Sequence, residues 1–328
     1  MTTKKTLDLV CALTEKDILG RTDFGTKVKH VVVLRSQGIN VPDGFAISQE
    51  VYNEFVAPHM AKIEKIIGTY SRNEAAHYIR KMFLSLTINK SVQDAISEEI
   101  KRCNPAGFYA VRSSGIACSS NAMVNEDSTT TALAGQYETC LMVPASQVLM
   151  AVRHCWASLF NERSLAAFDP VRNKSYLQRS TMSVLVQRMI HGEASAVAMT
   201  IDPCETEELI GIEATYGPCE ALVSGVVTGD LYHVDRASRL LKRMTLGTKR
   251  IKLEYEPFQG IKPSNLQRIP TSTTERGTFA LSAAVIEQIA HIAMEIESIF
   301  NAPQDIEVAV LENRLYILQA RSITAFCT

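Results

Sequence analysis

The stretch Asp305-Ile-Glu-Val-Ala-Val-Leu-Glu-Asn-Arg-Leu-Tyr-Ile-Leu-Gln-Ala-Arg-Ser-Ile-Thr324 contains two runs of alternating, strand-prone residues around a short polar segment. The polar segment, Glu312-Asn313-Arg314, includes an asparagine, which tolerates the positive φ that a tight hairpin turn requires. The pattern therefore predicts a β-hairpin whose two strands fold back around Asn313.

The register of this hairpin places four polar side chains on one face. If the strands pair symmetrically about Asn313, Glu307 lies opposite Gln319 and Asp305 lies opposite Arg321. All four positions are odd-numbered, so the pleat of the strands puts them on the same side. The other side is predicted to face a core and carries Ile306, Val308, Leu318 and Ala320.

Two interpretations of this polar face remain open from the residues alone. Carboxylate and amide oxygens suit Mg²⁺, and a guanidinium suits a phosphoryl group, so the face fits a metal ion bound together with phosphates. The same residues also fit a surface hairpin whose polar side is simply solvated. A register slip of one residue would scatter the set.

The composition is that of a globular protein with room for two lobes. The chain has 328 residues, of which 46% are hydrophobic and 21% are charged. Its 34 basic and 35 acidic residues leave a formal net charge of −1, so the charge balance favours neither nucleic acid nor an anionic membrane as partner.

The cysteines and the apolar patterning predict a cytoplasmic protein. None of the eight cysteines forms a C-x-x-C pair, the sequence shows no signal-peptide pattern, and no apolar run is long enough to span a bilayer. Scattered cysteines in such a chain are typical of reduced thiols. The sequence therefore predicts neither a zinc site nor a disulfide framework.

The predicted elements change character along the chain. Helical spacing of apolar residues predicts helices over 51–66, 74–88 and 91–102. From residue 182 onward strands dominate, and the strand 182–190 is expected to pair with 195–201 as a hairpin. The stretch 237–278 predicts no definite element. This division suggests two α+β lobes, an N-terminal one over 1–185 and a C-terminal one over 186–328, with a hinge near Val186–Met189.

Two basic residues of the first lobe are candidate phosphate ligands. Lys27 stands two residues after Gly25 at a predicted turn-to-helix entry, although a single exposed lysine is more often solvated. Arg112 is predicted to end a short strand, 108–112, at a position where ligand sites are common, and a structural salt bridge is the alternative. The sequence lacks the glycine-rich motifs of the common nucleotide folds, and its seven histidines show no metal-ligand spacing.

Taken in order, many short segments resemble the nucleotide-binding domain shared by pyruvate phosphate dikinase, phosphoenolpyruvate synthase and rifampin phosphotransferase. The resemblance runs from about residue 10 to Thr324. The matching segments are Gly25-Thr-Lys27, Gly38-Ile-Asn-Val-Pro-Asp-Gly-Phe45, Ala110-Val-Arg-Ser-Ser114, Glu126-Asp-Ser128, Ala134-Gly-Gln136, Cys155-Trp-Ala-Ser-Leu-Phe160, Val186-Gln-Arg-Met189, Thr200-Ile-Asp-Pro203, Tyr216-Gly-Pro-Cys-Glu220, Asp305-Ile-Glu307 and Leu318-Gln-Ala-Arg321.

The resemblance implies an ATP-grasp fold of the α+β class, with ATP between two lobes, and it implies roles for individual residues. Lys27 and Arg112 would hold the triphosphate, and the strand Gln187–Met189 would lie on the adenine side. Arg321 would act on the transferring phosphoryl group, with Asp305 beside it. The implied catalytic residues are Arg112, Asp305, Glu307 and Arg321, the implied nucleotide-binding residues are Lys27, Arg112, Gln187, Met189, Glu220, Gln319 and Arg321, and the implied Mg²⁺ ligands are Glu307 and Gln319.

Four motifs depart from the family's pattern. The family's Gly-Gly-Lys is Gly25-Thr-Lys27 here, and its Ser-Gly-Val is Ser195-Ala-Val197. Its Gly-Leu-Gly-Glu is Gly217-Pro-Cys-Glu220, and its Gln-x-Arg-Pro is Gln319-Ala-Arg-Ser322. These changes affect the details of loops and leave the charged residues in place.

The resemblance predicts an ATP- and Mg²⁺-dependent phosphotransferase that acts on a small-molecule acceptor. Larger family members pass the phosphoryl group to a histidine on a swivelling domain, and the sequence lacks a glycine-rich loop bearing Thr-Ser-His. Direct transfer is therefore expected. The alternatives are a ligase that forms an acyl-phosphate, an excised domain or one served by a phosphohistidine-bearing partner protein, and a non-catalytic nucleotide-binding module. The acceptor and the choice between ADP and AMP as product stay open.

Overall fold

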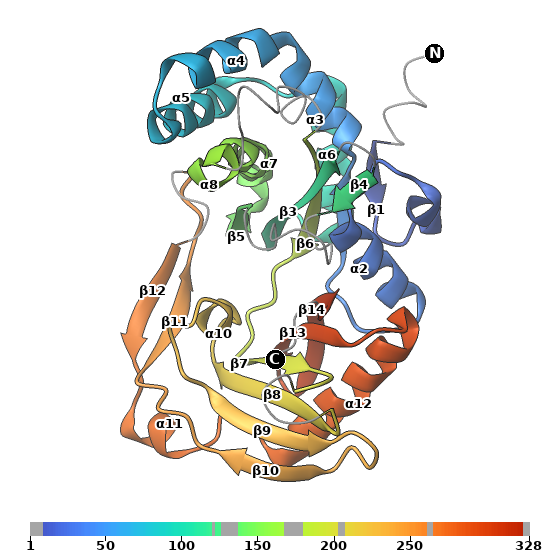
Figure 1. Ribbon diagram of the computed structural model, residues 1–328, viewed down its shortest axis with the longest axis vertical. Coiled ribbons are helices and arrows are strands. Elements are labelled where there is room, and N and C mark those ends of the chain that lie inside the picture. The colour runs from blue at the N-terminus through green and yellow to red at the C-terminus, as the bar shows by residue number, and fades with distance from the viewer. Residues whose placement is uncertain are drawn as a thin grey trace. The chain divides into compact units, whose positions relative to one another are not determined.

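The computed structural model describes residues 9–119, 122–125, 137–166, 180–202, 207–260 and 265–323 (Figure 1). Its helices and sheets confirm the α+β class. The matched segments Glu126-Asp-Ser128 and Ala134-Gly-Gln136 lie outside the described residues. The chain forms two compact units: unit 1 comprises the described residues of Met1–Val32, Asp43–Met189 and Pro257–Asn265, and unit 2 those of Val33–Pro42, Ile190–Glu256 and Leu266–Thr328.

The units divide the chain differently from the predicted boundary at 185/186. That boundary falls inside strand β6 (Thr181–Arg188), which stays in unit 1 because it pairs with strands on both of its sides. The chain passes to unit 2 after Met189. The sequence pattern also missed two excursions, Val33–Pro42 into unit 2 and Pro257–Asn265 into unit 1.

The sheet of unit 1 is antiparallel throughout its described strands. Its order is β1 (Val10–Ala12), β2 (Gly44–Ile47), β6, β3 (Phe108–Ser119) and β4 (Ala122–Asn125), and β5 (Thr139–Pro144) pairs with the first part of β3.

Strand β3 is longer than predicted. It continues past Arg112 through Ser119, so Arg112 lies inside the strand and the prediction that it ends the strand is wrong. The residues that follow Arg112, Ser113, Ser114 and Gly115, pair with β6 inside a buried sheet. Strand formation depends on such neighbours more than on intrinsic preference.

Helices cover the sheet of unit 1. The predicted helical stretches correspond to α3 (Gln49–Val56) with α4 (Met60–Thr69), to α5 (Arg72–Ser85) and to α6 (Lys90–Cys103). Helix α7 (Val148–Ala157) contacts β3, β5 and β6, and the short α8 (Glu162–Ala166) contacts α5. Trp156 of α7 is fully buried, and its ring centroid lies 4.8 Å from that of Phe55 and 6.1 Å from that of Tyr52.

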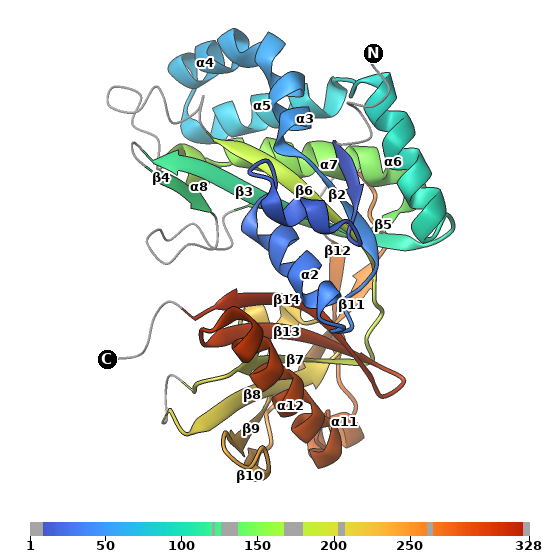
Figure 2. The ribbon, with the colours of Figure 1, turned by 90° about the vertical axis from the view of Figure 1, so that its right-hand side faces the viewer.

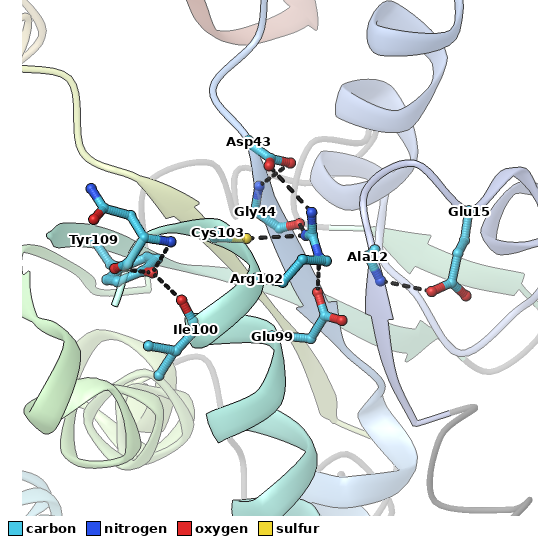
Figure 3. A network of polar contacts seen from close by, with 10 residues as sticks. Ala12, Glu15, Asp43, Gly44, Glu99, Ile100, Arg102, Cys103 and Tyr109 are labelled. Carbon is cyan, nitrogen blue, oxygen red and sulfur yellow. Dashed lines mark hydrogen bonds and ion pairs between the residues drawn. The ribbon is translucent and has the colours of Figure 1, made fainter. Parts of the chain in front are cut away.

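Polar contacts fix the start of β2 against the end of α6 (Figure 3). The guanidinium of Arg102 donates to the carbonyl oxygen of Gly44 at 2.8 Å, to Asp43 Oδ2 at 3.3 Å and to Glu99 Oε2 at 2.8 Å. A Cβ atom at Gly44 would lie 2.0 Å from the carbonyl oxygen of Val186, so only glycine lets β2 approach β6 this closely.

The sheet of unit 2 carries the predicted hairpin (Figure 2). Its order is β10 (Leu241–Thr245), β9 (Asp230–Asp235), β8 (Leu209–Tyr216), β7 (Ala194–Met199), β13 (Gln304–Leu311) and β14 (Arg314–Ser322). Helix α12 (Ala283–Phe300) contacts β7, β9, β10 and β13 and buries one side of the sheet. None of the described helices, α12 included, combines the length and the apolar character needed to cross a bilayer.

The predicted hairpin of 182–190 with 195–201 is wrong. Strand β6 pairs with β2 and β3 in unit 1, whereas β7 pairs with β8 and β13 in unit 2. Both edges of each strand are therefore occupied by other partners, which leaves no edge for a β6–β7 ladder.

The stretch 237–278, for which the sequence predicts no element, is partly regular. It contributes β10, the ribbon of β11 (Ile251–Glu256) with β12 (Asn265–Pro270), and the short helix α11 (Thr273–Gly277). A small core of Ala221, Val227 and Leu253 connects the ribbon with the short helix α10 (Glu220–Val223). β10 pairs with the preceding strand β9 and β11 pairs with β12, and their largely exposed side chains show little of the apolar alternation that marks a half-buried strand.

Candidate nucleotide and phosphate site

Strands β13 and β14 pair in the predicted register at the end of the hairpin that lies away from the turn. Asp305 lies opposite Arg321, and Glu307 lies opposite Gln319, which confirms the two pairings on which the polar face depends. Strand β14 is the last strand of this sheet. Its edge is partly paired with the segment before β2, because Ile317 N donates to the carbonyl oxygen of Asn40 at 2.9 Å.

The turn contains one residue fewer than predicted, and a bulge in β14 restores the register beyond it. Leu311 pairs with Arg314, so the turn has two residues, Glu312 and Asn313, at φ of 50° and 59°. The register then shifts between Glu307 and Val308.

Leu318 is the extra residue of β14 at this bulge. Val308 pairs with Ile317 and Glu307 pairs with Gln319, which leaves Leu318 between the two pairs. The prediction that Leu318 faces the core is therefore wrong, because Ile317 is buried in its place and Leu318 is only half-buried. The bulge changes which positions of β14 face inward and so keeps Gln319 and Arg321 beside the carboxylates.

The face with the four polar residues is the more open side of the sheet. Along β13, Ile306 and Val308 are buried, whereas Asp305 and Glu307 are half-buried. Arg321 donates from Nε and Nη2 to Asp305 Oδ2, at 2.9 and 2.7 Å. The side chains of Arg321 and Asp305 remain 35% and 13% exposed, so the pair can still be reached by a ligand.

Glu307 and Gln319 are directly opposite neighbours on this face, where cross-strand side chains lie close together. Their carboxylate and amide oxygens fit Mg²⁺, which prefers oxygen ligands and usually takes one or two from protein, with phosphates and water supplying the rest. Among the described residues, no group of three or more His, Cys, Asp and Glu side chains is arranged to hold a metal ion.

A third carboxylate, which the sequence motifs do not predict, lies on the same face. Val197 of β7 pairs with Glu307 on one side and with Glu213 of β8 on the other, so all three point to one side of the sheet. Glu213 Oε1 accepts a hydrogen bond from Gly229 N at 2.8 Å. The sequence does carry one indication that Glu213 faces this side: Gly211 and Glu213 alternate along β8 with Ile210 and Ile212, which are buried.

Lys27 lies in the first turn of α2 (Thr26–Ser36), as the predicted turn-to-helix entry requires. Its Nζ donates to the carbonyl oxygen of Ser113 in β3 at 3.3 Å. Lys27 therefore lies next to the strand that carries Arg112.

Arg112 and Gln187 lie on one face of the unit 1 sheet. Arg112 pairs with Leu185 and Gln187 pairs with Ala110, so the pleat places both side chains on the same side. Both are buried, at 8% and 2% exposure. Met189 follows β6, and its N–H donates to the carbonyl oxygen of Phe108 at 2.8 Å.

Glu220 begins the short helix α10, and its Oε2 accepts a hydrogen bond from the hydroxyl of Tyr255 at 3.1 Å. Gly217, three residues earlier, has a φ of +75°, and a Cβ atom there would lie 2.6 Å from the carbonyl oxygen of Leu253. The glycine of this motif is therefore required by the backbone.

The predicted site residues thus form two sets. Unit 1 holds two cations together with Gln187 and Met189, and unit 2 holds the carboxylates, the amide of Gln319 and the third cation. The members are, in unit 1, Lys27, Arg112, Gln187 and Met189, and, in unit 2, Glu220, Asp305, Glu307, Gln319 and Arg321.

Asp23 fixes the segment that leads to Lys27. Arg21 Nε and Nη2 donate to the two carboxylate oxygens of Asp23, at 2.9 and 2.5 Å, and Ser48 Oγ donates to Oδ2 at 2.6 Å. Burial by itself raises the pKa of Asp23, but the hydrogen bonds from Arg21 and Ser48 outweigh it, so the pKa lies below its usual value of 3.8.

We expect Asp23→Asn to destabilise the protein in a pH-dependent way. A lowered pKa in the folded state contributes stability above pH 3.8, and this contribution is lost as the pH falls through the folded-state pKa. The variant should lose about 1–3 kcal/mol at pH 7 and approach the wild type at lower pH. Urea unfolding at pH 7 and at pH 3 measures both differences, and an equal loss at the two pH values would contradict this account.

The chain is similar in sequence to two kinds of enzyme, over most of its own length. The chain is 31% identical to a probable phosphoenolpyruvate synthase of Methanothermobacter thermautotrophicus, over 93% of this chain and 45% of the relative. It is 30% identical to a rifampicin phosphotransferase of Bacillus cereus, over 88% of this chain and 32% of the relative. The chain thus spans less than half the length of either protein.

Solved structures and a family model complete the comparison. A D-alanine–D-alanine ligase from Bacillus anthracis and Cdc123 from Schizosaccharomyces pombe align with TM-scores of 0.31 and 0.35, which carry no argument about the fold. The ATP-grasp arrangement therefore remains what the family resemblance implies. The model of the pyruvate phosphate dikinase AMP/ATP-binding domain, in contrast, matches residues 23–326. This match covers most of the sequence, and the chain belongs to that nucleotide-binding family.

Proposed function

We propose that this chain binds ATP together with Mg²⁺ and transfers a phosphoryl group to a small-molecule acceptor. The observation that carries the proposal is the pairing of Glu307 with Gln319 and of Asp305 with Arg321 on the half-open face of the unit 2 sheet. Membership in an AMP/ATP-binding family supports the nucleotide. The names of the relatives, a phosphoenolpyruvate synthase and a rifampicin phosphotransferase, support the reaction class.

Each set of residues has a separate task in this proposal. Lys27 and Arg112 neutralise the triphosphate, and Gln187 and Met189 lie on the adenine side, with Glu220 as a further nucleotide contact. Glu307 and Gln319 hold Mg²⁺, which when bound neutralises charge on the phosphate oxygens. Asp305 fixes the guanidinium of Arg321 through two hydrogen bonds, so that the guanidinium is oriented before a phosphoryl group arrives.

We propose direct transfer to the acceptor. A phosphorus–oxygen bond of ATP breaks and its electron pair stays with the leaving nucleotide oxygen. A new bond forms to an acceptor oxygen, which loses its proton. A phosphohistidine on a partner protein is the alternative route, and the two routes differ in whether an acid-labile phosphoprotein appears during turnover.

Phosphorus NMR tests the proposal with the wild-type chain, ATP, Mg²⁺ and a pool of small-molecule acceptors prepared from a cell extract by ultrafiltration. The expected result is loss of ATP with a new phosphate-ester or related resonance, and the nucleotide product, ADP or AMP, is read from the same spectrum. A coupled amide in place of a phosphorylated product would indicate an acyl-phosphate ligase. ATP binding without turnover against any pool would indicate a nucleotide-binding module and contradict the proposal.

A further inference from the structure

A buried serine joins the Lys27 segment to the sheet of unit 1. Ser183, in the middle of β6, is fully buried, and its Oγ accepts a hydrogen bond from Gly25 N at 2.9 Å. The same hydroxyl donates to the carbonyl oxygen of Ser114 at 3.2 Å. A serine hydroxyl has one proton and two lone pairs, so both bonds form at the same time. Ser183 thereby links the start of α2 with the backbone of β3.

The loop before α2 lies directly on β3. A Cβ atom at Gly25 would lie 2.3 Å from Ser114 Oγ and 2.8 Å from the carbonyl oxygen of Ser114. Helix α2 begins at the next residue, and Lys27 in its first turn donates to the carbonyl oxygen of Ser113. The position of Lys27 is therefore defined relative to β3, the strand that also holds Arg112.

The start of α2 needs an anchor from elsewhere in the chain. Gly25, the residue before the helix, has no side chain with which to cap the free N–H groups of the first turn. It is small enough to touch the strand, and this contact brings its own N–H to the hydroxyl of Ser183. Without that acceptor, a buried N–H group would lose its hydrogen bond and the helix end could move away from the strand.

We propose that Ser183 is a positioning residue for Lys27: it sets the spacing between the two cations of unit 1 that receive the triphosphate. This inference rests on the proposed function, because it assigns Lys27 and Arg112 to ATP. Ser183 itself has no contact with the nucleotide in this proposal and acts through the backbone at Gly25 and Ser114.

The test compares ATP binding by the full chain in the presence of Mg²⁺, measured by isothermal titration calorimetry. Loss of the Gly25 anchor in Ser183→Ala should weaken ATP binding by about 5- to 30-fold. The matched control is Thr181→Ala, which removes another buried β6 hydroxyl, one that bonds Asn53 Oδ1 at 2.9 Å. This control should bind ATP within about twofold of the wild type.

A double variant shows whether Ser183 acts through Lys27. If it does, Ser183→Ala combined with Lys27→Ala binds ATP no more weakly than Lys27→Ala alone. Additive losses would overturn the positioning role. Equal ATP affinity of Ser183→Ala and the wild type would also overturn it.

Hydrogen exchange without nucleotide separates this inference from the proposed function. The Gly25 amide should exchange faster in Ser183→Ala than in the wild type and in Thr181→Ala. Unchanged exchange would overturn the anchor whatever happens with ATP. Faster exchange in a protein whose wild type binds no ATP would support the anchor and overturn the proposed function.

Discussion

Replacing Glu307 with alanine should lower ATP turnover by about 10²–10³-fold, the usual cost of removing a group that stabilises transition-state charge or holds the metal that does so. Glu307 supplies the carboxylate of the proposed Mg²⁺ pair, and Gln319 alone offers a neutral oxygen. The loss should persist at saturating ATP, because the carboxylate acts on the transferring group as well as on binding. Release of ADP or AMP under steady-state conditions provides the measurement.

Glu295→Ala is the matched control for this prediction. Glu295 is an exposed residue of α12 in the same unit, so the variant removes the same charge away from the polar face. It should retain wild-type turnover. Full activity in Glu307→Ala, with the control also active, would place the chemistry elsewhere in the molecule.

Replacing Lys249 with methionine should destabilise unit 2 by about 3–5 kcal/mol, because it removes one member of a buried ion pair. Lys249 and Asp230 have fully buried side chains and bond to each other. The carboxylate of Asp230 also accepts from Gly247 N at 2.8 Å and from Ala280 N at 2.7 Å. Without Lys249 its charge stays buried with no cation beside it.

Hydrogen exchange at the amides of β9 measures this loss directly, since the single tryptophan, Trp156, reports on unit 1. Lys242→Met serves as the control, because Lys242 is 55% exposed and pairs with Asp235 at the surface, so its loss should change little. The double variant Lys249→Met with Asp230→Asn should recover part of the stability, because it removes the orphaned charge and keeps an oxygen that can accept from a backbone N–H. Wild-type protection in Lys249→Met would show that the pair contributes nothing.

The hairpin could be predicted because its information is local. Alternating residues and a turn with Asn313 define two strands and one register, and the structure has the predicted pairings at Glu307 and Asp305. The bulge at Leu318 could not be predicted from the sequence. It arises because the strands form a two-residue turn and also pair Glu307 with Gln319 and Asp305 with Arg321. Symmetric pairing about Asn313 gives the correct partners of Asp305 and Glu307 only because two deviations cancel. The turn is one residue shorter than predicted, and the bulge adds one residue to β14.

The errors concern pairings between distant segments. A strand pattern does not reveal which edges are already occupied, and the expected pairing of β7 with β6 is wrong because β8 and β13 hold both edges of β7. Arg112 lies inside β3 because β6 continues the ladder past it to Ile116, a pairing that the end of the apolar run at Arg112 does not reveal. Glu213 joins the polar face only through its neighbour in β7, a relation that the sequence does not display.

Electron paramagnetic resonance of Mn²⁺, used in place of Mg²⁺, tests most directly whether Glu307 and Gln319 hold the metal of a metal–nucleotide complex. With ATP present, the wild-type chain should convert the sharp signal of free Mn²⁺ to that of the bound ion, and the double variant Glu307→Ala with Gln319→Ala should leave much of the Mn²⁺ unbound to protein. Equal binding of Mn²⁺ and ATP by the wild type and the double variant would contradict the assignment of the polar face as the phosphoryl-transfer site.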